Sequence, residues 1–184
     1  MTVIHWPEAI GWAGKAGPAL TTSTASTDIT PTDAKTIVGS CSLHQGQVIR
    51  IVGAAQLSNI VTTPGNFGLH LMYNAAIVWG ASNLMLLSTT ANTTLPLWFE
   101  FLIIMNSSGT AATASVTRRC TGKGLSLLNV ATSTTVVTTL VDQGTTSAID
   151  TTLNAAFFSV NGQFSVSNAG NNITVQQLLV EVIN

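Results

Sequence analysis

The sequence predicts an all-β fold, a jelly-roll-like antiparallel β-sandwich preceded by an extended, irregular N-terminal arm. Three observations predict this class. From residue 35 onward, segments rich in β-branched or alternating side chains recur about every 8–12 residues, turn residues separate them, and no helical periodicity lasts beyond about two turns. A chain of 184 residues is long enough for one hydrophobic core. We therefore expect an arm over residues 1–34 and a single β domain over residues 35–184.

The arm shows neither strand nor helix periodicity, yet it contains two of the four tryptophans. Disordered tails are usually poor in aromatic residues, so we expect this segment to pack on protein. Two hypotheses are open: the arm docks on a neighbouring subunit, or it lies back over its own core. On the first hypothesis the anchors are Trp6, Pro7 and Trp12, because buried aromatic residues dominate the energy of interfaces.

The first half of the β domain contains three predicted strands. Residues 36–38 and 47–58 are rich in β-branched side chains, which favour strands. Pro64-Gly65 is a turn signal, and residues 66–73 after it alternate in polarity. The apolar side chains expected on one face of that strand are Phe67, Leu69, Leu71 and Tyr73.

A near-continuous apolar run over residues 95–105 predicts a strand buried on both faces or at a subunit interface. The polar sequence 106–109 breaks this run, and residues 110–120 follow as a polar, alternating strand. The run contains one charged residue, Glu100, and burying a lone carboxylate is expensive. We expect Glu100 either to lie on an exposed face or to pair with an arginine; the candidates are Arg50, Arg118 and Arg119.

The C-terminal part predicts a hairpin followed by a last strand. Asn161-Gly162 lies between two alternating runs, and this dipeptide favours the positive φ angles of tight hairpin turns. Residues 167–172 form another polar turn, and residues 173–183 close the chain as a strand.

Charge is scarce in this chain. Only 7% of residues are charged, against about a quarter in an ordinary soluble domain, while 46% are hydrophobic. Such a surface is expected to be covered by other protein, which indicates a permanent, homo-oligomeric assembly component. The net charge of −1 and the single short basic cluster argue against nucleic-acid binding. No stretch has the length and apolarity of a membrane span and no export leader is recognisable, so we expect synthesis in a cytoplasm and no membrane contact.

No motif for catalysis, metal binding or a cofactor is recognisable, so we expect no enzyme activity and no cofactor. His5, His44 and His70 are not spaced as metal ligands, and His70 is expected to be a packed or hydrogen-bonded ring. Cys41 and Cys120 are expected to be buried thiols.

Several strings resemble tailed-bacteriophage virion structural proteins; they are residues 19–25, 62–65, 89–98 and 164–175. The resemblance extends from about residue 19 to the last residue. It implies a small all-β decoration (cement) protein on the capsid exterior, with the major capsid protein and sister copies, in a trimer, as partners. It transfers no catalytic residue.

Two alternatives remain open. A tail-fibre or spike module that binds host-surface carbohydrate predicts exposed aromatic residues and carboxylates clustered at one end of the module, with measurable glycan binding. A glycan hydrolase predicts a pair of carboxylates in a cleft.

Overall fold

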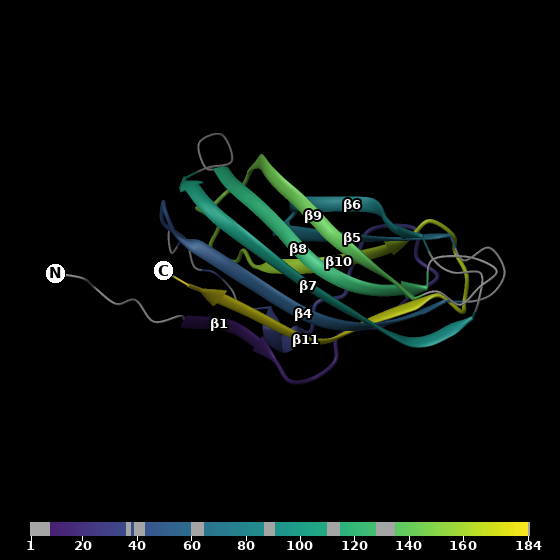
Figure 1. Cartoon of the computed structure of the whole chain (residues 1–184). Coiled ribbons are helices and arrows are strands. Elements are labelled where there is room, and N and C mark those ends of the chain that lie inside the picture. The colour runs from purple at the N-terminus through teal and green to yellow at the C-terminus, as the bar shows by residue number, and fades with distance from the viewer. Residues whose placement is uncertain are drawn as a thin grey trace.

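Two antiparallel sheets pack face to face in the computed structural model, which describes residues 8–35, 38, 43–59, 65–86, 91–109, 115–127 and 135–183 (Figure 1). In spatial order, the large sheet contains β1 (Glu8–Ala13), β11 (Asn172–Val182), β4 (Val48–Asn59), β7 (Asn92–Ser107), β8 (Ser115–Leu127) and β9 (Thr135–Ala148), with β2 (Leu20–Thr21) also paired to β11. The small sheet contains β3 (Thr27–Asp28), β10 (Phe158–Phe164), β5 (Asn66–Tyr73) and β6 (Ala76–Leu86). Over the described ranges the only helical element is the 3-10 turn η1 (Thr32–Ala34), so the predicted all-β sandwich is confirmed. No described helix is long and apolar enough to cross a membrane.

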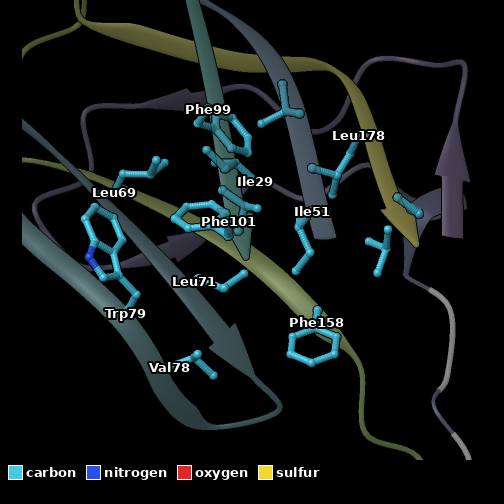
Figure 2. Packing of buried hydrophobic residues seen from close by; sticks show 14 of the residues in the cluster. Ile29, Ile51, Leu69, Leu71, Val78, Trp79, Phe99, Phe101, Phe158 and Leu178 are labelled. Carbon is cyan, nitrogen blue, oxygen red and sulfur yellow. The ribbon is translucent and has the colours of Figure 1, made fainter. Parts of the chain in front are cut away.

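The core lies between the two sheets, and in the large sheet β4, β7 and β11 each contribute alternate side chains to it. Figure 2 shows aromatic rings from both sheets meeting there. Trp79 of β6 and Phe101 of β7 have ring centroids 5.4 Å apart, within the range of favourable aromatic pairs. The apolar face predicted for residues 66–73 is confirmed, since Phe67 and its three apolar partners on that face are all buried. Gly68 and His70 on the opposite face are buried as well, so burial itself does not alternate along this strand.

The central strand β7 is buried on one face only. Its inner face carries side chains at most 2% exposed, namely Leu97, Phe99, Phe101, Ile103 and Met105. Trp98 and Ile104, on the opposite face, are 39% and 43% exposed. Burial on both faces is therefore wrong for the single chain, because only one sheet lies against β7. The alternative of a subunit interface stays a prediction.

Residues 8–34 lie against the chain's own sheets. β1 pairs with β11, with Glu8 opposite Val182, and β3 pairs with β10. The backbone N–H of Gly17 donates to the carbonyl of Val175 at 2.8 Å. Of the two hypotheses for the arm, packing on its own core therefore applies to these residues. The division at residue 34 stays a prediction, and the candidate anchors Trp6 and Pro7 lie outside the described residues.

The hairpin predicted at Asn161-Gly162 is wrong. Both residues lie within the single strand β10, where Asn161 is opposite His70 and Gly162 is opposite Leu69. Neither has a positive φ. Pairing with β5 on one side and β3 on the other overrides the local turn preference. A Cβ at Gly162 would already lie 3.1 Å from Leu20, so the glycine serves close packing here.

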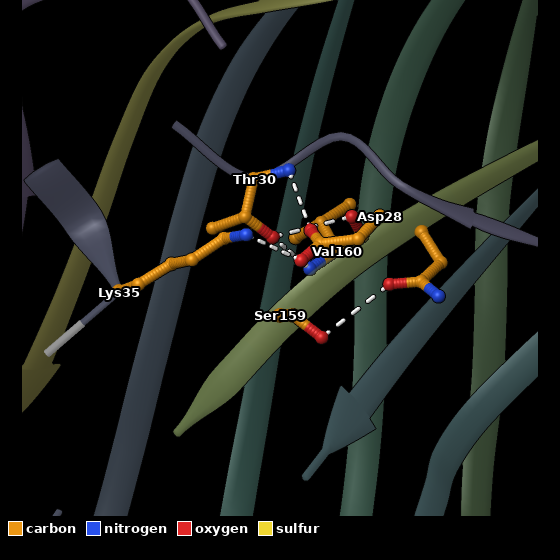
Figure 3. A network of polar contacts seen from close by, with 6 residues as sticks. Asp28, Thr30, Lys35, Ser159 and Val160 are labelled. Carbon is orange, nitrogen blue, oxygen red and sulfur yellow. Dashed lines mark hydrogen bonds and ion pairs between the residues drawn. The ribbon is translucent and has the colours of Figure 1, made fainter. Parts of the chain in front are cut away.

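Beyond β3, the edge of β10 and the residues before it are contacted by Ile29, Thr30 and Val38. Figure 3 shows the polar contacts around Thr30. The Thr30 hydroxyl accepts a hydrogen bond from the N–H of Val160 at 2.8 Å and donates to its carbonyl at 3.3 Å. Asp28 accepts from the Thr30 N–H at 2.8 Å and forms an ion pair with Lys35 at 2.6 Å. The buried hydroxyl thus binds the N–H of Val160, while the backbone N–H of Ile29 donates to the Val160 carbonyl at 2.9 Å.

Replacing Thr30 with valine keeps the shape of the side chain and removes the hydroxyl, which leaves the N–H of Val160 without this partner. We expect Thr30→Val to lower the free energy of unfolding by about 1–3 kcal/mol, the usual effect of orphaning a buried polar group. Thr30→Ser is the matched control and should recover most of the loss. Urea unfolding of the three proteins measures this; equal stability of the valine and serine variants would contradict it.

Candidate functional site

The outer face of the large sheet carries a hollow with a volume of about 280 Å³. A tryptophan contributes to it from each side: Trp12, which is 67% exposed, on β1, and Trp98 on β7. Between the two indoles the lining consists of Val52, Gly53, Ala54, Gln177, Leu178 and Leu179. Large exposed aromatic residues that share one depression on a soluble protein are typical of binding surfaces.

Strand register places these residues together. In one row across the sheet, Trp12 is opposite Leu179, which is opposite Val52. In the next row, Ala54 is opposite Trp98. Since β11 and β4 separate β1 from β7, the two tryptophan-bearing strands are about 14 Å apart, three strand spacings. The small side chains on β4 leave the space between the indoles open.

Amide side chains lie beside the hollow where β11 changes register. A register shift between Val175 and Gln177 marks a β-bulge, an irregularity that redirects side chains at functional edges. Gln177 lines the hollow and is exposed, while Gln176 donates from its amide to that of Gln56 on β4 at 3.3 Å. The bulge thus brings amide donors and acceptors next to an otherwise apolar floor.

An ion-pair cluster spans three strands on the same face. Arg50 on β4 donates from Nε to Glu100 on β7 and, at 2.9 Å, from its terminal nitrogen to Glu181 on β11. Both hydrogen bonds raise the pKa of the Arg50 guanidinium, and the one with Glu100 has the larger effect. Glu100 is opposite Val52 in the ladder, so the cluster adjoins the hollow. The sequence prediction that Glu100 pairs with an arginine is confirmed, and the partner is Arg50.

The histidine predictions have different outcomes. His70 is 6% exposed, and its Nδ1 lies 3.0 Å from the hydroxyl of Ser26, which confirms a packed, hydrogen-bonded ring. His5 and Cys41 lie outside the described residues, and the structure does not describe the side chain of Cys120. Within the described ranges no three His, Cys, Asp or Glu side chains are grouped as a metal site.

Among the described residues, the carboxylates of Glu100 and Glu181 are not placed as the pair that a glycan hydrolase needs in its cleft. Glu100 and Glu181 are close together, but Arg50 binds both, and neither lines the hollow. The expectation that the chain is not an enzyme stays a prediction.

Trp98 is not among the site residues expected from the sequence. It lies inside the apolar run 95–105, where neighbours on both sides are also apolar. One signal in the sequence could have identified it. Trp98 is two positions before Glu100, the one charged residue of the run, and side chains two positions apart lie on the same face of a strand. Trp98 is therefore expected on the solvent-facing side, with Glu100. The pairing with Trp12 could not be found this way, because it depends on which strands are neighbours.

In comparisons with known proteins, no family model and no curated protein matches this chain. Solved structures that are similar to this chain include the following two. One is the CBM2 module of the evolved Dit of Lactobacillus casei BL23 phage J-1, with a TM-score of 0.39 and 11% identity, over 99% of this chain and 98% of that one. The other is a legume lectin-like domain from Entamoeba histolytica, with a TM-score of 0.30 and 9% identity, over 92% and 89%.

Burial lowers the pKa of His70 below its ordinary value of 6.5. Below about pH 6.5 the unfolded chain therefore binds a proton that the folded chain does not, and folding stability should fall as the pH falls through this range. His70→Asn keeps a hydrogen-bonding side chain without this titration, so its stability should vary less between about pH 8 and about pH 5. Thermal unfolding of both proteins at the two pH values measures the difference; parallel pH profiles would contradict it.

Proposed function

We propose that this chain is a non-catalytic, glycan-binding β-sandwich module of a virion, and that the hollow between Trp12 and Trp98 is its sugar-binding surface. The observation that carries the proposal is the pair of exposed indoles that line one hollow, with a mainly aliphatic floor between them. A sugar ring presents C–H groups on its faces and hydroxyls around its edge. An indole face is apolar and electron-rich, so it suits such a C–H face.

The polar groups around the hollow supply what the hydroxyl edges of a sugar need. Gln177 offers an amide that both donates and accepts. Arg50 uses two of its five N–H donors in its ion pairs with Glu100 and Glu181, and these two carboxylates hold the guanidinium in place. Fixed polar groups beside an apolar surface are the usual basis of orientation and specificity in small-molecule sites.

The virion setting rests on the sequence resemblance to phage structural proteins. The capsid-cement role, the trimer and the major capsid protein as partner remain predictions, and two of the three arm residues expected to anchor them lie outside the described structure. A stable protein interface buries about 800 Å² on each partner. Such an interface involves about 20–30 residues on each side, whereas eight residues line the hollow, which suits a ligand that lies along it.

Each tryptophan should contribute separately to glycan binding. We expect Trp12→Ala and Trp98→Ala each to weaken binding about 5- to 30-fold, corresponding to about 1–2 kcal/mol per lost aromatic contact. Isothermal titration calorimetry against host-surface polysaccharides, preceded by a screen to find the one bound, measures this. Ile104→Ala is the matched control, since Ile104 is a 43% exposed apolar residue on the same strand that does not line the hollow.

Two outcomes would reject the glycan function. One is a wild-type protein that binds no surface polysaccharide but restores heat resistance to capsids lacking it, which is the behaviour of a cement protein. The other is binding that both tryptophan variants retain in full.

Ligand length gives a second prediction. The two tryptophan-bearing strands are about 14 Å apart, wider than one sugar ring, so a monosaccharide contacts one indole and a longer fragment contacts both. Affinity should rise by about tenfold or more as fragments become long enough to bridge the hollow, since the second contact is then intramolecular. Titration with a size series of one polysaccharide measures the rise, and Trp98→Ala should abolish it. A monosaccharide that binds as tightly as the longest fragment would contradict this.

A further inference from the structure

We propose that Gly14 is a positioning residue, which allows the indole of Trp12 to take the orientation that the sugar-binding hollow requires. This inference rests on the proposed glycan site and names a determinant of that site outside the residues that line it. Gly14 follows the last residue of β1 and is itself exposed, so nothing in its burial calls for a glycine.

The contact is with the far end of the indole. A Cβ added to Gly14 would lie 2.8 Å from Cη2 of Trp12 and 3.2 Å from Cζ2. Both atoms belong to the six-membered ring, the part of the side chain farthest from its own backbone. The indole of Trp12 therefore folds along the chain and lies against the backbone of Gly14. This contact gives the ring a defined position although the side chain is 67% exposed.

The backbone does not require a glycine here. Among described glycines, positive φ angles occur at Gly46, Gly65 and Gly109, and Gly14 is not one of them. An alanine thus fits the backbone of residue 14, and the loop that follows is fixed by the hydrogen bond from Gly17 to Val175. The Cβ of an alanine at residue 14 would, however, clash with the Trp12 ring in its present position.

The strain from a Cβ at Gly14 is relieved by moving the indole. The ring end of an exposed side chain can shift at little cost to the fold, so Gly14→Ala should displace the aromatic surface and leave the protein folded. Gly53, under the floor of the hollow, is the contrasting case: a Cβ there would lie 2.1 Å from Cζ of the buried Phe99 ring. A side chain added at Gly53 would displace the buried core, whereas a side chain added at Gly14 would displace the indole on the binding surface.

Preorganisation is the reason that this displacement matters for binding. A ring already in its bound orientation loses little conformational freedom when the ligand arrives, and a displaced or freely rotating ring loses more. We expect Gly14→Ala to weaken glycan binding about 5- to 10-fold, approaching but not reaching the effect of Trp12→Ala. Its thermal midpoint should be unchanged or slightly raised, because alanine restricts the unfolded chain more than glycine does.

A double-substitution cycle tests whether Gly14 acts through Trp12. Calorimetry on the polysaccharide bound by the wild type compares Gly14→Ala in two backgrounds, with Trp12 present and with Trp12→Ala. The substitution should weaken binding in the first background and have no effect in the second. Ala16→Ser, which also adds one heavy atom to an exposed position of the same loop, is the matched control and should bind like the wild type. An equal loss in both backgrounds would overturn the proposal.

The ring position has a readout that needs no ligand. The indole N–H resonance of Trp12, assigned by its disappearance in Trp12→Phe, should shift in Gly14→Ala and stay in place in Ala16→Ser. If the wild type binds no glycan, the proposed function fails, while this shift still decides whether Gly14 sets the ring position. An unshifted resonance, or a shifted one with undiminished affinity, would overturn the inference. Gly14→Ser, which introduces the same Cβ, serves as a second variant if the alanine protein does not fold.

Discussion

The rest of the structure depends on the two-residue alternation of β4 and β7, the adjacent central strands of the large sheet. On β4, Ile49 and Ile51 point into the core, while Arg50 and Val52 point to the outer face. The same two strands therefore build both the interior and the candidate binding surface. A register slip of one residue would turn both sets of side chains over, so the stability of the core keeps the outer surface in register. Core packing on the inner side of the sheet therefore also fixes the positions of the residues that line the hollow on its outer side.

The Arg50 cluster adds a constraint on the outer side. One guanidinium bonds to carboxylates from both neighbouring strands, so β11, β4 and β7 are tied together by charge as well as by backbone pairing. The three side chains are between 13% and 37% exposed, so solvent screens the attraction only in part. In a chain with so few charges, three of them are used to fix the relative position of the strands that form the hollow.

Local sequence patterns predicted much of the fold and little of the site. The apolar face of residues 66–73 and the last strand were predictable because side-chain direction in a strand alternates between consecutive residues. The hairpin at Asn161-Gly162 failed because turn preference is weak beside pairing on two sides. The site joins Trp12 to Trp98 across two strands from other parts of the chain, and no local pattern encodes that neighbourhood. The orientation of the Trp12 ring depends on a third residue, which is still less visible in the sequence.

The pairing of Glu8 with Val182 has an architectural consequence. The first and last strands are neighbours, so the chain enters and leaves the large sheet at one corner. A domain whose two ends meet at its surface can be inserted into a loop of a larger polypeptide with little distortion of either partner. A domain inserted in this way would be attached to its carrier at the corner where β1 begins and β11 ends. The broad face of the sheet, with both indoles, would remain free to meet a surface outside the carrier.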